Sequence, residues 1–237
     1  MTAADNPHGK ARQDPGTAPD AELLIAPGCV HCPVVLAGLA ELVKRGQVGR
    51  LTVINIAAHP DEAAQRGVRG VPWIRLGAFE LQGAHSQSEL AAWAKRAAAP
   101  DGAAGYLREL LETGQLDTAT GACRRSPEAL LPALLALAGD LDTPFAVRVG
   151  VGAVLEDLAE TGLPAAVMPA LQRLAASEHA QVRADAAHFL GLEGSPSAAE
   201  ILARLGQDPD PEVREIAAES LAGADTGNGP QDSPERR

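Results

Sequence analysis

Aromatic side chains, cysteines and basic residues are all scarce in this sequence. Phe, Trp and Tyr make up 3% of the 237 residues, so a core must be built from Leu, Val, Ile and Ala, which suits packed helices better than a β-sandwich. Three cysteines are too few for a disulfide-stapled secreted scaffold. The formal net charge of −11 argues against a general nucleic-acid binder, because neutralising phosphates requires clustered Lys and Arg.

The sequence also lacks the apolar segments that secretion and membrane insertion require. Its first twenty residues contain no apolar core of a signal peptide. Residues 23–40 are uncharged, but Pro27, Gly28 and Pro33 within them would break a helix in lipid. We therefore expect a cytoplasmic protein that binds neither membranes nor nucleic acid, in a compartment that keeps thiols reduced.

Charge is distributed unevenly along the chain, and this predicts two domains. Residues 20–98 carry seven acids and eight bases, whereas residues 101–222 carry nineteen acids and eight bases. The composition of residues 99–102 is typical of a linker. The expected parts are a disordered segment at 1–19, an α/β domain at 20–98, a helical repeat domain at 103–222 and a disordered tail at 223–237.

Residues 20–98 alternate between strand and helix patterns. Short apolar or β-branched runs predict strands at 22–26, 51–56, 71–76 and 79–82. Helical spacing and helix-start residues predict helices at 30–45, 60–66 and 86–96. In the last of these, Ser86 and Glu89 fit a capping box. The order β-α-β-α-β-β-α predicts a sheet covered by helices.

Residues 103–222 show no strand pattern and repeat themselves instead. Val182, Arg183, Ala186 and Leu190 recur 31 positions later as Val213, Arg214, Ala217 and Leu221, and Val147-Arg148 begins a weaker earlier copy. Such a period, with two helices in each unit, predicts an α-solenoid rather than an irregular helical bundle. The units resemble HEAT repeats of the short type found in bilin-lyase-related proteins, which implies a protein partner on the repeats.

One motif indicates a chemical reaction. It is Cys29-Val30-His31-Cys32-Pro33, which lies between a predicted strand and an amphipathic helix. Free N–H groups at the helix start favour a thiolate at Cys29, the attacking species in thiol–disulfide exchange. Cys32, one turn later, is placed to attack a mixed disulfide. The alternatives are two buried thiols or half a metal site, but the sequence offers no second Cys-x-x-Cys or His pair. We expect no metal and no cofactor.

This strand, Cys-x-x-Cys and helix resemble the opening of thioredoxins, and residues 67–72 (GVRGVP) resemble their second motif. The resemblance covers residues 20–98 and implies a thioredoxin fold. It also implies that Pro72 follows a cis bond and lies against the cysteines, and that Val71 offers backbone hydrogen bonds to a bound chain. Two departures stand out. Gly28 precedes Cys29 in place of the usual Trp, and Leu23 stands where thioredoxins carry a buried acid.

Three further residues leave alternatives open. His31 could stabilise the Cys29 thiolate and make the disulfide more oxidising, or it could be a solvated His at a helix start. Trp73 could belong to the core or face a substrate. Cys123 is expected to be a structural thiol rather than a third redox partner. Arg148, Arg183 and Arg214 recur at equivalent positions and predict a structural polar ladder.

Together these observations predict a thiol–disulfide oxidoreductase acting on a protein disulfide or dithiol. Cys29 and Cys32 are the predicted catalytic residues, and His31, Val71 and Pro72 are the predicted supporting residues. The repeats would dock a protein partner. The alternative prediction is a non-catalytic scaffold or assembly factor that uses its thioredoxin-like fold for recognition.

Overall fold

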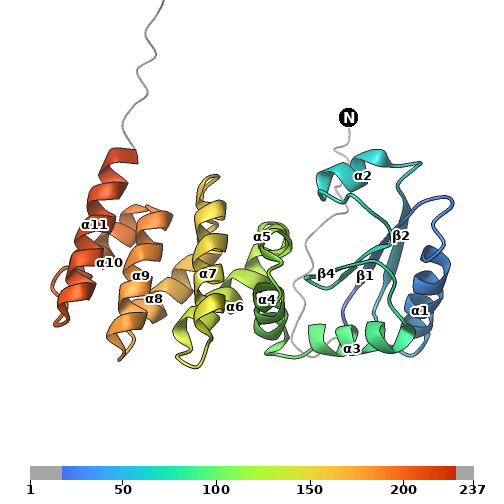
Figure 1. The fold of residues 1–237 in the computed structure, drawn as a ribbon, viewed down its shortest axis with the longest axis horizontal. Helices are drawn as coiled ribbons and strands as arrows, with labels where there is room; N and C mark the ends of the chain where they lie inside the picture. Colours follow the sequence, from blue (N-terminus) through green and yellow to red (C-terminus); the bar gives the residue numbers. More distant parts are fainter. Residues whose placement is uncertain (1–17, 228–237) are drawn as a thin grey trace, which may run out of the picture. The chain divides into compact units, whose positions relative to one another are not determined.

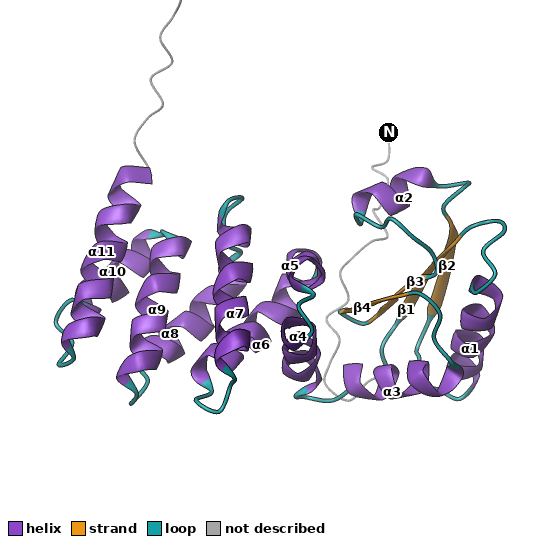
Figure 2. Ribbon diagram, viewed as in Figure 1, coloured by secondary structure: helices purple, strands orange, loops and turns teal. Residues whose placement is uncertain are grey.

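The structure, a computed structural model, describes residues 18–227 and divides into two compact units between Ala103 and Ala104 (Figures 1 and 2). The predicted disorder at residues 1–17 and 228–237 lies outside the described residues. Residues 223–227, predicted as part of the tail, instead continue the last helix, which ends at Gly227. Within residues 18–227, no helix combines the length and the apolar character needed to cross a membrane.

The first unit has the predicted order of elements, β-α-β-α-β-β-α. They are β1 (Ala21–Ile25), α1 (Cys32–Lys44), β2 (Leu51–Asn55), α2 (Pro60–Gln65), β3 (Trp73–Leu76), β4 (Phe79–Gln82) and α3 (Gln87–Ala97). The strands form one mixed sheet in the order β2-β1-β3-β4. β2 runs parallel to β1, whereas β3 is antiparallel to both β1 and β4.

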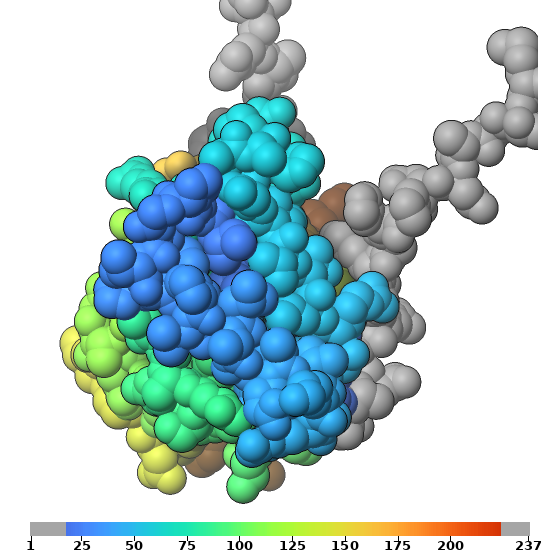
Figure 3. Space-filling model, turned by 90° about the vertical axis from the view of Figure 1, so that its right-hand side faces the viewer, coloured from blue at the N-terminus to red at the C-terminus, as the bar shows by residue number. Residues whose placement is uncertain are grey.

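The core of this unit lies between one face of the sheet and the helices α1 and α3. Leu23 of β1 is paired with Ile74 of β3, and both pack in one cluster with Leu39 of α1 and Leu90 of α3. The capping box predicted at the start of α3 is present, with the Ser86 side chain and the Glu89 side chain each bonded to the other's backbone. Figure 3 shows the outer surface of this unit, with α1 in blue.

Strand β3 begins two residues later than predicted. The reason is Pro72, which has no N–H to donate to a strand ladder and therefore delays regular pairing until Trp73. Trp73 is 1% exposed, so its side chain is buried and does not face a substrate; it lies on the sheet face opposite its neighbour Ile74.

The second unit consists of helices in its described residues. They are α4 (Gly102–Glu112), α5 (Leu116–Arg125), α6 (Pro127–Gly139), α7 (Phe145–Ala159), the 3-10 turn η1 (Ala165–Val167), α8 (Met168–Ala175), α9 (Ala180–Glu193), α10 (Pro196–Leu205) and α11 (Pro211–Gly227). Helices α5, α7, α9 and α11 contact one another in succession, and α6, α8 and α10 form a second row (Figure 1). This two-row stacking is the arrangement expected of an α-solenoid.

The 31-residue period is visible in the contacts of the repeats. Arg183 donates from Nη1 to the carbonyl oxygens of Ser177 and Glu178, and Arg214 donates in the same way to those of Asp208 and Pro209. Each arginine side chain is thus hydrogen-bonded to the loop that precedes its own helix.

Arg148, the third member of the predicted ladder, has a different role. It pairs with Asp185 and so joins α7 to α9. The three arginines therefore have structural contacts, as predicted, but those of Arg148 differ from those of Arg183 and Arg214.

The helices α9 and α11 approach closely at Gly191, where an added Cβ would lie 2.7 Å from Cβ of Ser220.

Candidate redox site

The cysteine pair lies where β1 gives way to α1. The chain turns at Pro27 and Gly28, and the Cys29 N–H donates to the carbonyl oxygen of Ala26 over 3.3 Å. Gly28 has φ of +78°, which suits a residue without a Cβ at this position of a turn. The turn places Cys29 just before the first residue of α1, Cys32.

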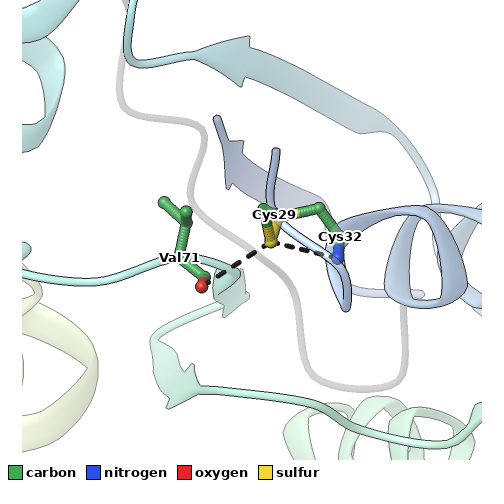
Figure 4. Close-up of a disulfide and its surroundings, with 3 residues drawn as sticks. All are labelled: Cys29, Cys32 and Val71. Carbon is green, nitrogen blue, oxygen red and sulfur yellow. Dashed lines mark hydrogen bonds between the residues drawn. A yellow bond between two sulfur atoms is a disulfide. The ribbon is translucent and has the colours of Figure 1, made fainter. Parts of the chain in front are cut away.

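Cys29 and Cys32 are joined by a disulfide, with an S–S distance of 2.10 Å and a Cα–Cα distance of 5.5 Å (Figure 4). Cys32 is 4% exposed, and Cys29 is half-buried. Cys29 is therefore the more exposed residue of the pair, and the roles of the two cysteines in exchange stay predictions.

The start of α1 provides a donor for a thiolate at Cys29. The backbone N–H of Cys32 donates to Cys29 Sγ over 3.2 Å, and the first turn of α1 contains no acidic side chain. Both the N–H group and the positive end of the helix dipole favour negative charge on this sulfur after reduction. The geometry can thus support a nucleophilic Cys29.

The second motif meets the first at this point. The carbonyl oxygen of Val71 lies 3.7 Å from Cys29 Sγ, although the two residues are 42 positions apart (Figure 4). The Val71–Pro72 peptide bond is cis, as the resemblance implies. Pro72 is buried, and its carbonyl oxygen accepts a hydrogen bond from the Gly83 N–H over 2.9 Å. The fold therefore brings Cys29, Cys32 and Val71 together.

His31 lies at the N-cap of α1. Its side chain is exposed and makes no capping hydrogen bond. The neighbouring Val30 and Val34 are 78% and 63% exposed, so two aliphatic side chains close to the cysteines in sequence are open to solvent. A supporting role for His31 remains a prediction.

A buried carboxylate that sequence reasoning did not use lies on the far face of the sheet. Glu22 accepts from Arg66 Nη2 over 2.6 Å and from Arg75 Nη2 over 2.5 Å. Its neighbour Leu23 points into the core on the α1 side, so Glu22 faces away from the cysteines, as the alternation of a strand requires. An acid inside the apolar segment AELLI is the signal that could have suggested a buried ion pair.

Cys123 takes no part in this site. It is a buried free thiol on α5, and burial raises its pKa to about 12. A thiol that does not ionise at neutral pH is a poor nucleophile, which agrees with the structural role predicted for it. The described part of the chain also contains no group of three or more His, Cys, Asp or Glu side chains arranged to hold a metal.

Comparison with protein families finds a match within the second unit. A family model described as HEAT repeats matches residues 131–222, which run from α6 to α11. The match and the stacked helices support HEAT-type repeats over residues 131–222. HEAT repeats generally mediate protein–protein interaction, and their stacked helices offer an extended surface for it. No curated protein matches the chain. The thioredoxin resemblance of residues 20–98 has no such match and stays with our proposal.

Proposed function

We propose that this protein is a thiol–disulfide oxidoreductase of the thioredoxin type whose HEAT repeats dock a protein partner. The observation that supports it most is the meeting of the Cys29–Cys32 pair, the first N–H groups of α1 and the Val71 carbonyl at one point. In this proposal the redox domain spans residues 20–98 and the repeat domain spans residues 103–222. Its location would be the cytoplasm, where the substrate is a protein disulfide or dithiol.

The reaction begins from the reduced dithiol. The Cys29 thiolate attacks one sulfur of a substrate disulfide, forms a mixed disulfide and releases the other substrate sulfur as a thiolate. Cys32 then gives its proton to that departing thiolate and attacks Cys29 Sγ. This step breaks the mixed disulfide, releases the second substrate sulfur and restores the Cys29–Cys32 disulfide. Two electrons pass from the Cys29–Cys32 dithiol to the substrate. An external dithiol then reduces the Cys29–Cys32 disulfide again.

The backbone of Val71 has a separate task in this proposal. Its carbonyl lies beside the sulfur that attacks, so a substrate chain that bonds to the Val71 backbone would present its disulfide to Cys29. Pro72 maintains the shape of this segment. The exposed Val30 and Val34 would cover the aliphatic part of the bound chain.

A second candidate function is a non-catalytic scaffold or assembly factor. The observation that favours it is the HEAT-repeat match, because such repeats need no chemistry to bind a partner. In a scaffold the Cys29–Cys32 disulfide would be structural and would resist exchange.

Insulin reduction separates the two functions. With dithiothreitol as the electron source, the wild-type protein is expected to accelerate insulin reduction, and Cys29→Ser is expected to lower the rate to that of dithiothreitol alone. The matched control is Cys123→Ala, which removes a thiol outside the pair and should retain the wild-type rate. Wild-type protein that gives no acceleration would contradict the enzyme and favour the scaffold.

A further inference from the structure

The buried Glu22 carboxylate binds two arginines that lie on either side of the second motif. Arg66 follows directly after α2, and Arg75 is the third residue of β3. The Glu22–Arg66 and Glu22–Arg75 distances are 2.6 and 2.5 Å, with one guanidinium on each carboxylate oxygen. Glu22 of β1 therefore forms ion pairs with the residues at both ends of the segment that carries Val71 and Pro72.

Arg66 is itself held from the α2 side. Its Nη1 donates to the carbonyl oxygen of Glu62 over 2.8 Å and to the Glu62 carboxylate over 2.5 Å. The end of α2 is thus joined through Arg66 to β1, one of the two central strands of the sheet. Only residues 67–72 separate this joint from β3, and two of them, Gly67 and Gly70, lack side chains to pack.

The Glu22 carboxylate does not act on the cysteines directly, because it is paired with two arginines and points away from them. Its side chain is 7% exposed, both oxygens are paired, and it points to the sheet face opposite the α1 core. A proton-transfer role of the kind that thioredoxins give to a buried acid is therefore excluded by direction. The contacts of Glu22 are instead with the two residues that flank the segment carrying Val71 and Pro72.

We propose that Glu22 is a positioning residue, which holds residues 67–72 through Arg66 and Arg75 so that the Val71 backbone stays beside Cys29 Sγ. This inference rests on the proposed function, because its consequence is the presentation of a substrate disulfide to Cys29. A misplacement of about 1 Å at such a site costs up to about a hundredfold in rate.

Two variants with opposite charge changes test this role. Glu22→Gln removes a negative charge and Arg66→Gln removes a positive one, but both break the same Glu22–Arg66 ion pair. We expect both to lower the rate of insulin reduction about tenfold. The rate at which iodoacetamide alkylates reduced Cys29 should stay within about twofold of wild type, because this small reagent needs the thiolate but not the Val71 backbone.

The control is Glu41→Gln on α1. Glu41 also pairs with two bases, Lys44 at 3.0 Å and Arg45 at 3.1 Å, so it matches the charge change without touching residues 67–72. It should retain both rates. Arg66→Lys keeps the charge and should recover part of the insulin rate. If Glu22→Gln fails to fold, the two Arg66 variants decide the question without it.

Three results would overturn the positioning role. Changes of opposite sign in Glu22→Gln and Arg66→Gln would indicate a long-range charge effect. Equal falls in the insulin and iodoacetamide rates would indicate a damaged thiolate, and an unchanged insulin rate would show that the joint is not needed.

Amide hydrogen exchange separates this inference from the proposed function, because it needs no turnover. The role predicts faster exchange at residues 67–72 in Glu22→Gln and Arg66→Gln than in wild type and Glu41→Gln. Unchanged exchange would overturn the inference even if the wild-type enzyme is active. An inactive wild-type protein whose variants show the faster exchange would overturn the proposed function alone.

Discussion

Replacing Cys32 by serine will turn the protein into a covalent trap for its substrate. Without the Cys32 thiol, the mixed disulfide at Cys29 can be resolved only by an external thiol, and its decay becomes slow. When the reduced variant is mixed with excess insulin, most of the protein should carry one covalently bound insulin molecule, whereas wild type should carry only a trace. Mass spectrometry under non-reducing conditions measures both.

Two controls give this experiment its meaning. The double variant Cys29→Ser/Cys32→Ser should form no adduct, since Cys123 is buried, and dithiothreitol should release the bound insulin from the single variant. An adduct on Cys123, or equal trapping by Cys29→Ser, would show that the roles assigned to the two cysteines are wrong.

Replacing Asp208 by alanine is expected to destabilise the repeats more than the loss of any exposed ion pair. Asp208 accepts two hydrogen bonds from Arg183, each of 2.8 Å, and a third from the Asp210 N–H. The Arg183 and Asp208 side chains are only 14% and 7% exposed. Removing one partner of a buried pair costs about 3 kcal/mol of unfolding free energy, since the other charge stays buried. Urea denaturation followed by far-ultraviolet circular dichroism measures this.

The matched control is Asp157→Ala. Asp157 pairs with Arg124 over 3.0 Å and also joins neighbouring helices, but both side chains are about half exposed. Exposed pairs contribute at most about 1 kcal/mol, so this variant should stay close to wild type. Equal losses in the two variants would show that burial of the Arg183–Asp208 pair is not what stabilises the repeats.

The same pair predicts a pH dependence. The hydrogen bonds from Arg183 hold the pKa of Asp208 below its ordinary value of 3.8. Because the folded pKa is below the unfolded one, the contribution of the pair is complete at neutral pH and is lost as the pH falls below 3.8. The difference in unfolding free energy between wild type and Asp208→Ala should therefore shrink in acid. A difference that stays constant down to pH 3 would contradict this.

The sequence predicted the elements of the first unit well because its signals are local. The capping box at Ser86 and the alternation of strand and helix patterns depend on residues a few positions apart. The start of β3 was predicted two residues too early, because the apolar pattern begins at Val71 and the missing N–H of Pro72 was not taken into account. The 31-residue period likewise found α9 and α11, since each copy repeats the same buried valine and the same arginine.

What the sequence did not predict depends on contacts between distant residues. Arg66 and Arg75 lie 44 and 53 positions from Glu22, and nothing in their local sequence indicates a shared carboxylate. Arg148 occupies a repeat position equivalent to those of Arg183 and Arg214, yet its partner is Asp185 on α9. The burial of Trp73 likewise followed only from the packed fold.

Titration of the Cys29–Cys32 pair against thiol buffers also tests the predicted role of His31. A tenfold change in stabilisation of the reduced form corresponds to about 30 mV for this two-electron couple. If an imidazole at the N-cap of α1 stabilises the Cys29 thiolate, His31→Pro should lower the reduction potential by roughly this amount. An unchanged potential would leave His31 as a solvated residue at a helix start.

The reduction potential of the wild-type pair is the most direct measurement of the central claim that Cys29 and Cys32 exchange electrons with other proteins. Thiol–disulfide enzymes lie between about −270 and −120 mV, whereas structural disulfides lie below about −300 mV. We expect one reversible two-electron transition of the Cys29–Cys32 pair within the range of the enzymes. A potential below about −300 mV, or a pair that does not re-form after reduction, would contradict it and leave the scaffold as the function of this chain.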